Sequence, residues 1–182
     1  MTTPIEDLGR DHRNMERLLA LIEDQVDRFR EGTPLDFDLL ASVLDYIRNF
    51  PERCHHPRED LVFQRLLTRH PSATEAIGDL LKEHRQLAEL TARLVEAVRY
   101  VELEMDVPRA RLESVARDYI AACRRHIAEE ERVFFPLAEQ RLTDEDWREI
   151  EAAISAPDDP LFGPRVEKHY LNLHERILRL GV

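Results

Sequence analysis

The chain has 182 residues, which fits one domain with a substantial hydrophobic core and is short for two. Its 37 acidic residues outnumber its 26 lysines and arginines and give a formal net charge of −11, so we expect no basic surface for nucleic acid. No segment is apolar for long enough to cross a bilayer, and the N-terminus lacks the basic and apolar regions of a signal peptide. We therefore predict a cytoplasmic protein that binds neither nucleic acid nor a membrane.

The chain contains only two cysteines, Cys54 and Cys123. Two cysteines make neither a disulfide framework nor a thiolate-rich metal site. Each lies within three residues of a histidine of the repeat described below, so a pairing between them stays open. We predict instead that both are reduced and fill small spaces in the core.

Two long segments carry apolar residues at alternating steps of three and four, which is typical of amphipathic helices packed on other helices. They predict helices over about residues 5–31 and 74–105, and each contains one histidine in its apolar stripe, His12 and His84. Two further long helices are expected over about 36–69 and 109–141. The stretches "EGTPLD", "HPSAT" and "MDVPR" separate the four, because proline, glycine and short polar residues end helices.

The helix expected over 36–69 contains Pro51 and Pro57. Each proline removes a backbone donor and crowds the preceding turn, so we predict a kink or a short break there.

Two shorter helices are expected after the fourth. Thr143 and Asp146 resemble a capping box and start a fifth helix, and apolar residues at helical spacing predict a sixth over about 165–180. Three aromatic residues are expected to anchor these helices: Trp147, Phe162 and Tyr170. The predicted fold class is all-α, an up-down-up-down four-helix bundle (5–141) with one or two additional C-terminal helices (143–182), in a single domain over 1–182.

The two halves of the bundle repeat a pattern. "DHRNM" at 11–15 matches "EHRQL" at 83–87, and "EDLVF" at 59–63 matches "EERVF" at 130–134. Four residues before each of the latter stretches stands a histidine, His55 or His126. Each half therefore offers one histidine from its first helix and a His-x-x-x-Glu motif from its second.

The spacing of these motifs decides which acidic residues share a face with the histidines. Residues four apart on a helix are neighbours, so His126 and Glu130 reach a common point, as do His55 and Glu59. Glu129 and Glu131 lie about 100° to either side of Glu130 and are predicted to face solvent.

The repeat selects six residues: His12, His55, Glu59, His84, His126 and Glu130. Their convergence in an apolar interior would be costly if nothing were bound, because buried carboxylates lose hydration and two close together resist joint ionisation. A pair of divalent cations removes this conflict. Mixed nitrogen and oxygen donors suit Fe, Mn, Zn or Co better than Ca or Mg.

In these motifs, His12, "HHPREDLVF" at 55–63, His84 and "HIAEEERVFFP" at 126–136, the chain resembles the hemerythrin-like family of HHE cation-binding domains over about residues 5–141. The resemblance implies two iron ions in a non-haem di-iron site, bridged by Glu59 and Glu130 and capped by the four histidines. Manganese or zinc could replace the iron. It also implies reversible binding of O₂ or a related small molecule.

One position departs from the oxygen-carrying members of that family. They have a second histidine one turn after that of the third helix, where this chain has Ala88. A water, or Glu16 one turn after His12, would then complete the coordination shell, and the metal pair would be more exposed and reactive.

Further residues near the six are candidates for the site. His56 and Asp60 form a competing i, i+4 pair one residue out of phase. The internal repeat favours His55 with Glu59, and His56 stays open as an alternative that a distortion at Pro57 would bring in. Tyr119 lies on the same helix face as His126; we expect it to pack in the core, and contact of its hydroxyl with a metal-bound ligand stays open. The remaining histidines have no counterpart in the repeat, and we predict surface positions for them: His70, His169 and His174.

The sequence thus predicts a protein that binds or senses O₂, NO or peroxide at a carboxylate-bridged metal pair, rather than a dedicated enzyme. Three rival functions stay open: a di-iron redox enzyme of the peroxidase or oxidase kind, an iron storage or buffering protein, and a metal-free bundle with a polar core. The expected partner is a small diatomic or peroxide ligand. A homodimer and an unidentified signalling partner also stay open.

Overall fold

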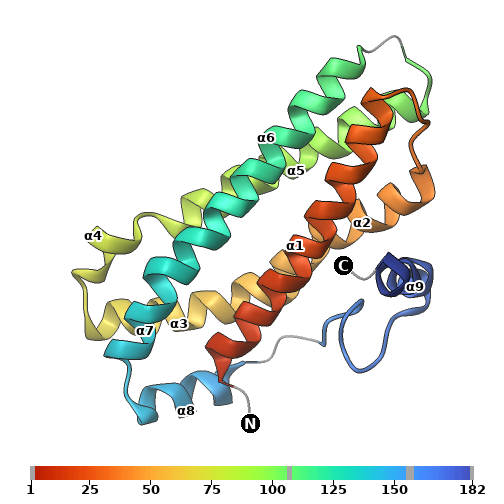
Figure 1. Ribbon diagram of the computed structural model, residues 1–182. Helices are drawn as coiled ribbons and strands as arrows, with labels where there is room; N and C mark the ends of the chain where they lie inside the picture. Colours follow the sequence, from red (N-terminus) through yellow and green to blue (C-terminus); the bar gives the residue numbers. More distant parts are fainter. Residues whose placement is uncertain (1–2, 106–107, 155–157, 181–182) are drawn as a thin grey trace.

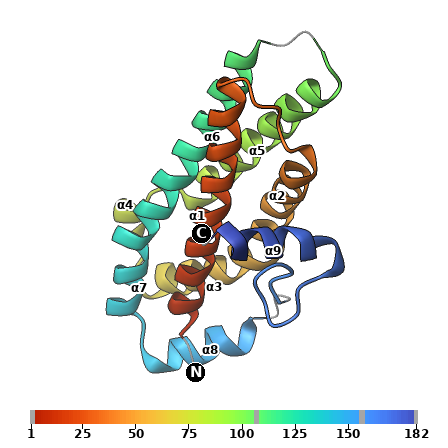
Figure 2. The same cartoon turned by 45° about the vertical axis from the view of Figure 1, so that its right-hand side comes forward.

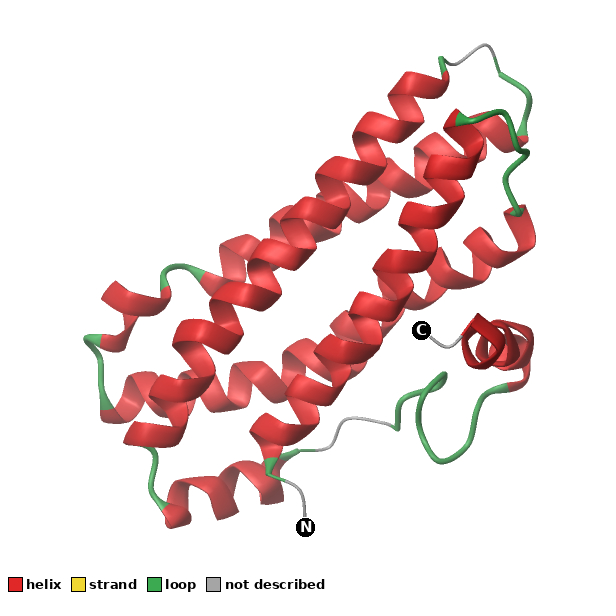
Figure 3. Cartoon of the chain, in the orientation of Figure 1, coloured by secondary structure: helices red, strands yellow, loops and turns green. Residues whose placement is uncertain are grey.

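The computed structural model describes residues 3–105, 108–154 and 158–180, and every regular element within these ranges is helical (Figures 1 and 3). The chain passes up, down, up and down through four long segments, which confirms the predicted all-α bundle (Figure 1). The segments are α1 (Pro4–Arg30), α2 with α3 (Phe37–Phe50 and His56–Arg69), α5 (Leu80–Glu102), and α6 with α7 (Arg109–Glu129 and Phe135–Arg141). No helix in the described part of the chain is long and apolar enough to cross a membrane.

The second segment is interrupted where the prolines predicted a kink. Residues Pro51–His55 form a π-helical turn, η1, which is closed by a hydrogen bond from the His56 N–H to the Pro51 carbonyl. Pro57 follows directly. Because Pro57 cannot donate a backbone hydrogen bond, the wider turn before it replaces the regular α-helical pattern.

The fourth segment contains a second π-helical turn, η2 (Glu130–Phe134), which the prediction of one continuous helix over 109–141 missed. Its closing bond runs from the Phe135 N–H to the Glu130 carbonyl, and Pro136 follows. Each π turn is therefore closed by the N–H of the residue before a proline.

The helix predicted over 74–105 is wrong at its start. A short helix α4 (Ala73–Ile77) ends at Gly78, whose φ of +81° is unfavourable for other residues, and α5 begins only at Leu80. The Asp79 side chain caps α5 by accepting a hydrogen bond from the Lys82 N–H at 3.0 Å.

The C-terminal part covers one end and one side of the bundle (Figure 2). Helix α8 (Asp144–Ala153) starts with the predicted capping box of Thr143 and Asp146. The last helix starts later than the predicted residue 165. A 3₁₀ turn, η3 (Lys168–Tyr170), precedes α9 (Leu171–Leu180). Pro160 and Pro164 lie in the irregular segment before this turn.

The expected aromatic anchors are confirmed. The Tyr170 hydroxyl donates to Asp45 in α2 at 2.7 Å, and Phe162 packs on the same apolar cluster as Tyr170. Trp147 packs on the cluster at the other end of the bundle.

The hydrophobic core consists of these two clusters. One includes Leu18, Ile22, Leu94, Leu112 and Cys123, and the other includes Leu8, Val62, Leu66, Leu80 and Phe134. On each of the four long segments, the histidine of the repeat lies between a residue of one cluster and a residue of the other. The site therefore forms a polar layer that apolar side chains enclose from both ends.

Candidate metal centre

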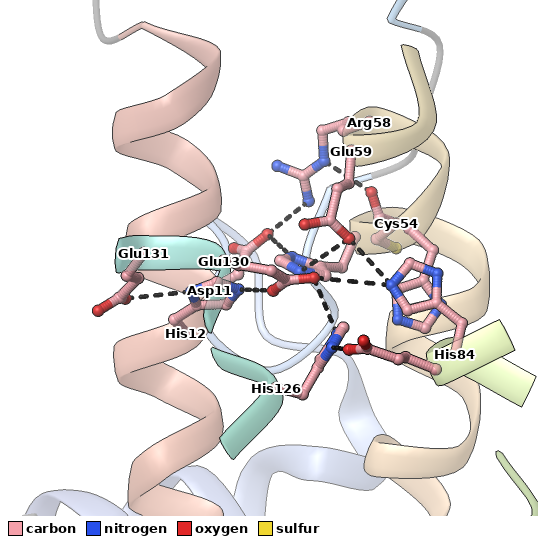
Figure 4. Close-up of polar contacts among 12 residues, drawn as sticks. Asp11, His12, Cys54, Arg58, Glu59, His84, His126, Glu130 and Glu131 are labelled. Atoms are coloured by element: carbon pink, nitrogen blue, oxygen red, sulfur yellow. Dashed lines mark hydrogen bonds and ion pairs between the residues drawn. The ribbon is translucent and has the colours of Figure 1, made fainter. Parts of the chain in front are cut away.

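The structure brings the six residues of the repeat together inside the bundle, and all six are buried (Figure 4). They form two overlapping groups, in each of which the ligand atoms lie within 4.8 Å of one another. One group is His12, His55, Glu59 and Glu130, and the other is Glu59, His84, His126 and Glu130. Both carboxylates thus belong to both groups, whereas each pair of histidines belongs to one.

The Glu130 carboxylate faces both groups with different oxygen atoms. Its Oε2 lies 3.2 Å from His12 Nε2, while its Oε1 lies 2.9 Å from His126 Nε2 and 3.7 Å from His84 Nε2. Figure 4 shows this carboxylate between His12 on one side and His84 and His126 on the other. This is the arrangement that a carboxylate bridging two cations requires.

Glu59 approaches the two groups from the opposite wall. Its Oε2 lies 3.2 Å from His84 Nε2 and 4.0 Å from His55 Nε2. The side chain is fully buried, with an exposed fraction of 0%.

Three of the histidines are oriented by carboxylates outside the six. In each, the Nδ1 atom lies in hydrogen-bonding contact with an acidic side chain, which leaves Nε2 directed at the centre. The pairs are His12 with Glu131 at 3.1 Å, His55 with Asp11 at 3.3 Å and His126 with Glu83 at 3.0 Å.

This orientation leaves the centre rich in acceptors. With Nδ1 carrying the proton that it donates to the outer carboxylate, Nε2 presents a lone pair toward the oxygens of Glu59 and Glu130. Six buried atoms of the site find no hydrogen-bond partner in the described part of the chain: His12 Nε2, His84 Nε2 and the four oxygens of the two glutamates. Facing acceptors of this kind need a positive charge between them, either protons on the imidazoles or metal ions, and the donor set fits a metal pair.

A comparison with known protein families matches residues 3–138 to the hemerythrin HHE cation binding domain. The chain belongs to the hemerythrin family. All six residues of the centre lie within the matched range, whereas α8 and α9 lie beyond it. Comparison with curated proteins and with solved structures finds no significant match.

The buried charges of this hemerythrin domain shift one another strongly. Burial alone would lower the pKa of His84, but the carboxylates of Glu130 and Glu59 outweigh it and raise that pKa to about 9. For Glu130, burial acts to raise the pKa, but the surrounding histidines lower it well below its usual value. Burial and the neighbouring Glu130 raise the pKa of Glu59. Protons thus balance the charges when no metal is bound, and cations must displace them.

His56 also reaches the centre of the hemerythrin domain. Its ring stacks on that of His84, with centroids 3.7 Å apart and planes 9° from parallel. Its side chain is 13% exposed, and its Nδ1 lies 3.4 Å from Glu52 Oε1. Burial, followed by the charge of the neighbouring His84, lowers the pKa of His56 to about 2, so the ring is neutral. Asp60, its predicted companion, joins none of the candidate ligand groups found among the described residues.

Glu16 and Tyr119, the two remaining candidates for the coordination shell, differ in position. Glu16 is exposed and binds Arg124 of α6 at 2.7 Å, so the expectation that it completes the shell is wrong. Tyr119 is buried beside the centre, and burial raises the pKa of its hydroxyl well above the usual value.

The acidic run after His126 is divided as predicted: Glu130 is buried, whereas Glu129 and Glu131 are exposed. The sequence analysis missed one contact, because the exposed Glu131 also lies 3.1 Å from Nδ1 of His12.

A cavity of about 140 Å³ opens beside the histidines. Its inner wall consists of the imidazoles, and its other walls are mainly apolar, with Met15, Leu87 and Tyr119. The exposed residues Arg48, Glu52 and Ala88 lie along it, so it connects the centre with the surface.

The two cysteines and the three histidines outside the repeat do not belong to the ligand groups described above. Cys54 and Cys123 are free and buried, as predicted. His169 is exposed, as expected, whereas the prediction for His174 is wrong: its ring is half-buried and its Nδ1 donates to the Leu161 carbonyl at 3.0 Å. His70 is half-buried at the end of α3, where its N–H donates to the Leu66 carbonyl.

Proposed function

We propose that this hemerythrin-family protein holds a pair of metal ions, iron in the native protein, and binds O₂, NO or peroxide there. The observation that carries the proposal is the Glu130 carboxylate, which directs one oxygen at His12 and the other at His84 and His126. A single cation would leave one of these oxygens, and the histidine beyond it, without a partner in a buried site.

The six residues divide into two ligand sets. His12 and His55 would hold one cation, and His84 and His126 the other, with Glu59 and Glu130 shared between them. A non-haem iron pair supplies electrons and open coordination positions for a small oxygen or nitrogen ligand. The outer carboxylates hold the imidazole rings in place, and the two apolar clusters limit the access of water to the centre.

The cavity gives the ligand its path. It leads from the surface past Ala88 to the imidazoles, and its apolar walls favour uncharged molecules over ions.

The direct test is metal analysis of the purified protein together with its absorption spectrum. We expect close to two irons per chain and, in the oxidised protein, the charge-transfer bands of an oxo-bridged iron pair, which zinc does not produce. Protein that folds and contains no metal, and takes up none when supplied with iron(II), would refute the proposal.

A second candidate function is a redox enzyme that acts on a small organic peroxide. It is favoured by the size of the cavity, because an apolar cavity of about 150 Å³ accepts a molecule as large as benzene. Turnover of tert-butyl hydroperoxide in the presence of an external reductant would favour the enzyme. Reversible O₂ or NO binding without turnover would favour the binding protein.

A further inference from the structure

We propose that His56 is a seventh metal ligand, which gives the cation at His84 and His126 a third imidazole. The inference rests on the metal pair proposed above and concerns one position of its coordination shell.

The position of the His56 ring supports ligation directly. One nitrogen of His56 lies within 4.8 Å of a nitrogen of His84 and a nitrogen of His126, so the three rings surround a common point. The ring of His56 also stacks on that of His84, with centroids 3.7 Å apart. An imidazole nitrogen binds a metal in the plane of its ring, so binding of one cation by both residues would tilt the two rings out of this parallel stack.

A carboxylate faces Nδ1 of His56, as it does in three of the histidines already assigned. Its Nδ1 faces Glu52 Oε1 at 3.4 Å, as the Nδ1 of His126 faces Glu83 at 3.0 Å. A carboxylate on Nδ1 selects the tautomer whose Nε2 is free to bind a metal. A histidine that only filled space in the core would not need this partner.

The backbone explains how two consecutive histidines contribute to one site. In a regular α-helix, His55 and His56 would diverge by about 100°. Here the π turn η1 ends at His55, and the His56 N–H closes it on the Pro51 carbonyl. With this turn in place, His55 lies in the group around His12 and His56 in the group around His84.

The internal repeat shows that this ligand is present on one side only. The residue equivalent to His56 in the second hairpin is Ile127, which lines the cavity and has no metal-binding atom. One cation would therefore have three imidazoles and the other two, and the second would keep more positions open for an exogenous ligand.

The test is an anaerobic titration with cobalt(II) of the full chain and two variants, His56→Phe and His56→Ala. Phenylalanine keeps a ring that can stack on His84 and removes both ring nitrogens, the proposed metal donor among them. We expect two cobalt ions per chain in the unaltered protein, and in both variants one ion bound as before and a second bound at least 10-fold more weakly. The d–d absorption of cobalt, which depends on coordination number, should change for that second ion alone.

Two further variants complete the experiment. His169→Ala removes an exposed histidine and should bind two ions like the unaltered protein. In His56→Phe/Ala88→His, a histidine one turn after His84 reaches the same point from α5 and should restore the second ion.

The outcomes separate the two proposals. If the unaltered protein fails to bind two ions, the metal pair itself is refuted. If it binds two and His56→Phe binds two with the same affinities and spectrum, only the role of His56 is refuted. The melting temperatures of the metal-free proteins show that each variant is folded, and the restored binding in the double variant would then exclude a packing defect.

Discussion

The two hairpins of the bundle share one ligand pattern and surround it differently. In both, the acidic residue just before the first histidine binds the histidine of the second helix: Asp11 binds His55, and Glu83 binds His126. Asp11 is buried and also pairs with Arg58 at 3.0 Å, whereas Glu83 is partly exposed. The shared contacts keep the imidazoles directed inward, and the differences make the two halves of the centre chemically unequal.

The largest expected effect separates the two shared carboxylates. Glu130→Ala should abolish binding of both metal ions, because this carboxylate faces three histidines, and the loss should exceed the roughly 10- to 100-fold typical of an outer partner. Glu59→Ala should weaken binding less, since one of its two histidines lies 4.0 Å away. Isothermal titration with cobalt(II) measures both, with the exposed Glu129→Ala as control. Equal losses in the two variants would contradict this ranking.

Removing the metal tests whether the cations, which would be bound by residues of both hairpins, stabilise the folded protein. At a free metal concentration 100 times its dissociation constant, each ion adds about 2.7 kcal/mol to the free energy of unfolding. For a chain of this length that corresponds to roughly 5–10 °C in melting temperature. Melting curves with and without a chelator measure the difference. An unchanged melting temperature after metal analysis has verified removal would show that the ions do not stabilise the fold.

The outer carboxylates should differ between the hairpins. Asp11→Asn should lower metal affinity by up to about 100-fold, because it disturbs a buried contact that also holds Arg58. Glu83→Gln should cost nearer 10-fold, because water can reach this side chain and partly replace it. The comparison uses the same titration, with the exposed Glu89→Gln as control. A larger loss for Glu83→Gln would reverse the inequality inferred from burial.

The smallest expected effect is on the free energy of unfolding, and it compares two glycines: Gly9 in α1 and Gly78 just before α5, the first long helices of the two hairpins. Gly78→Ala should destabilise the protein by about 1–3 kcal/mol, because φ of +81° and ψ of −154° strain any residue with a Cβ, although no atom lies within 4 Å of the added methyl group. Gly9→Ala in α1 should be neutral or stabilise by about 0.5–1 kcal/mol, since that glycine is helical and has room. Urea unfolding of the metal-free proteins measures both. A stabilised Gly78→Ala would show that the backbone there adapts without strain.

The bundle and the convergence of the six donors could be predicted because both depend on local periodicity and on a repeat visible in one chain. The i, i+4 spacing placed Glu130 beside His126 whatever the neighbouring helices did. The break near Pro51 was equally local, since proline acts on its own helix.

The surroundings of the centre could not be predicted in the same way. Asp11 stands next to His12 in the sequence but binds His55 on another helix, and such a contact depends on how the helices pack. The spacing of Glu16 from His12 suits a metal ligand, but Arg124 on α6 binds that carboxylate instead. Glu131 is exposed as predicted, but its contact with His12 on α1 could not be predicted, because that contact too depends on how the helices pack.

The position of the centre between the two apolar clusters also has a consequence for biosynthesis. Its donors are spread from residue 12 to residue 130, one or two on each long segment, so a nascent chain that stops short of Glu130 lacks the carboxylate that faces both groups of histidines. Stable metal capture therefore has to follow synthesis of nearly the whole bundle. A fully loaded centre would report that synthesis has passed Glu130 and that the four long segments have assembled.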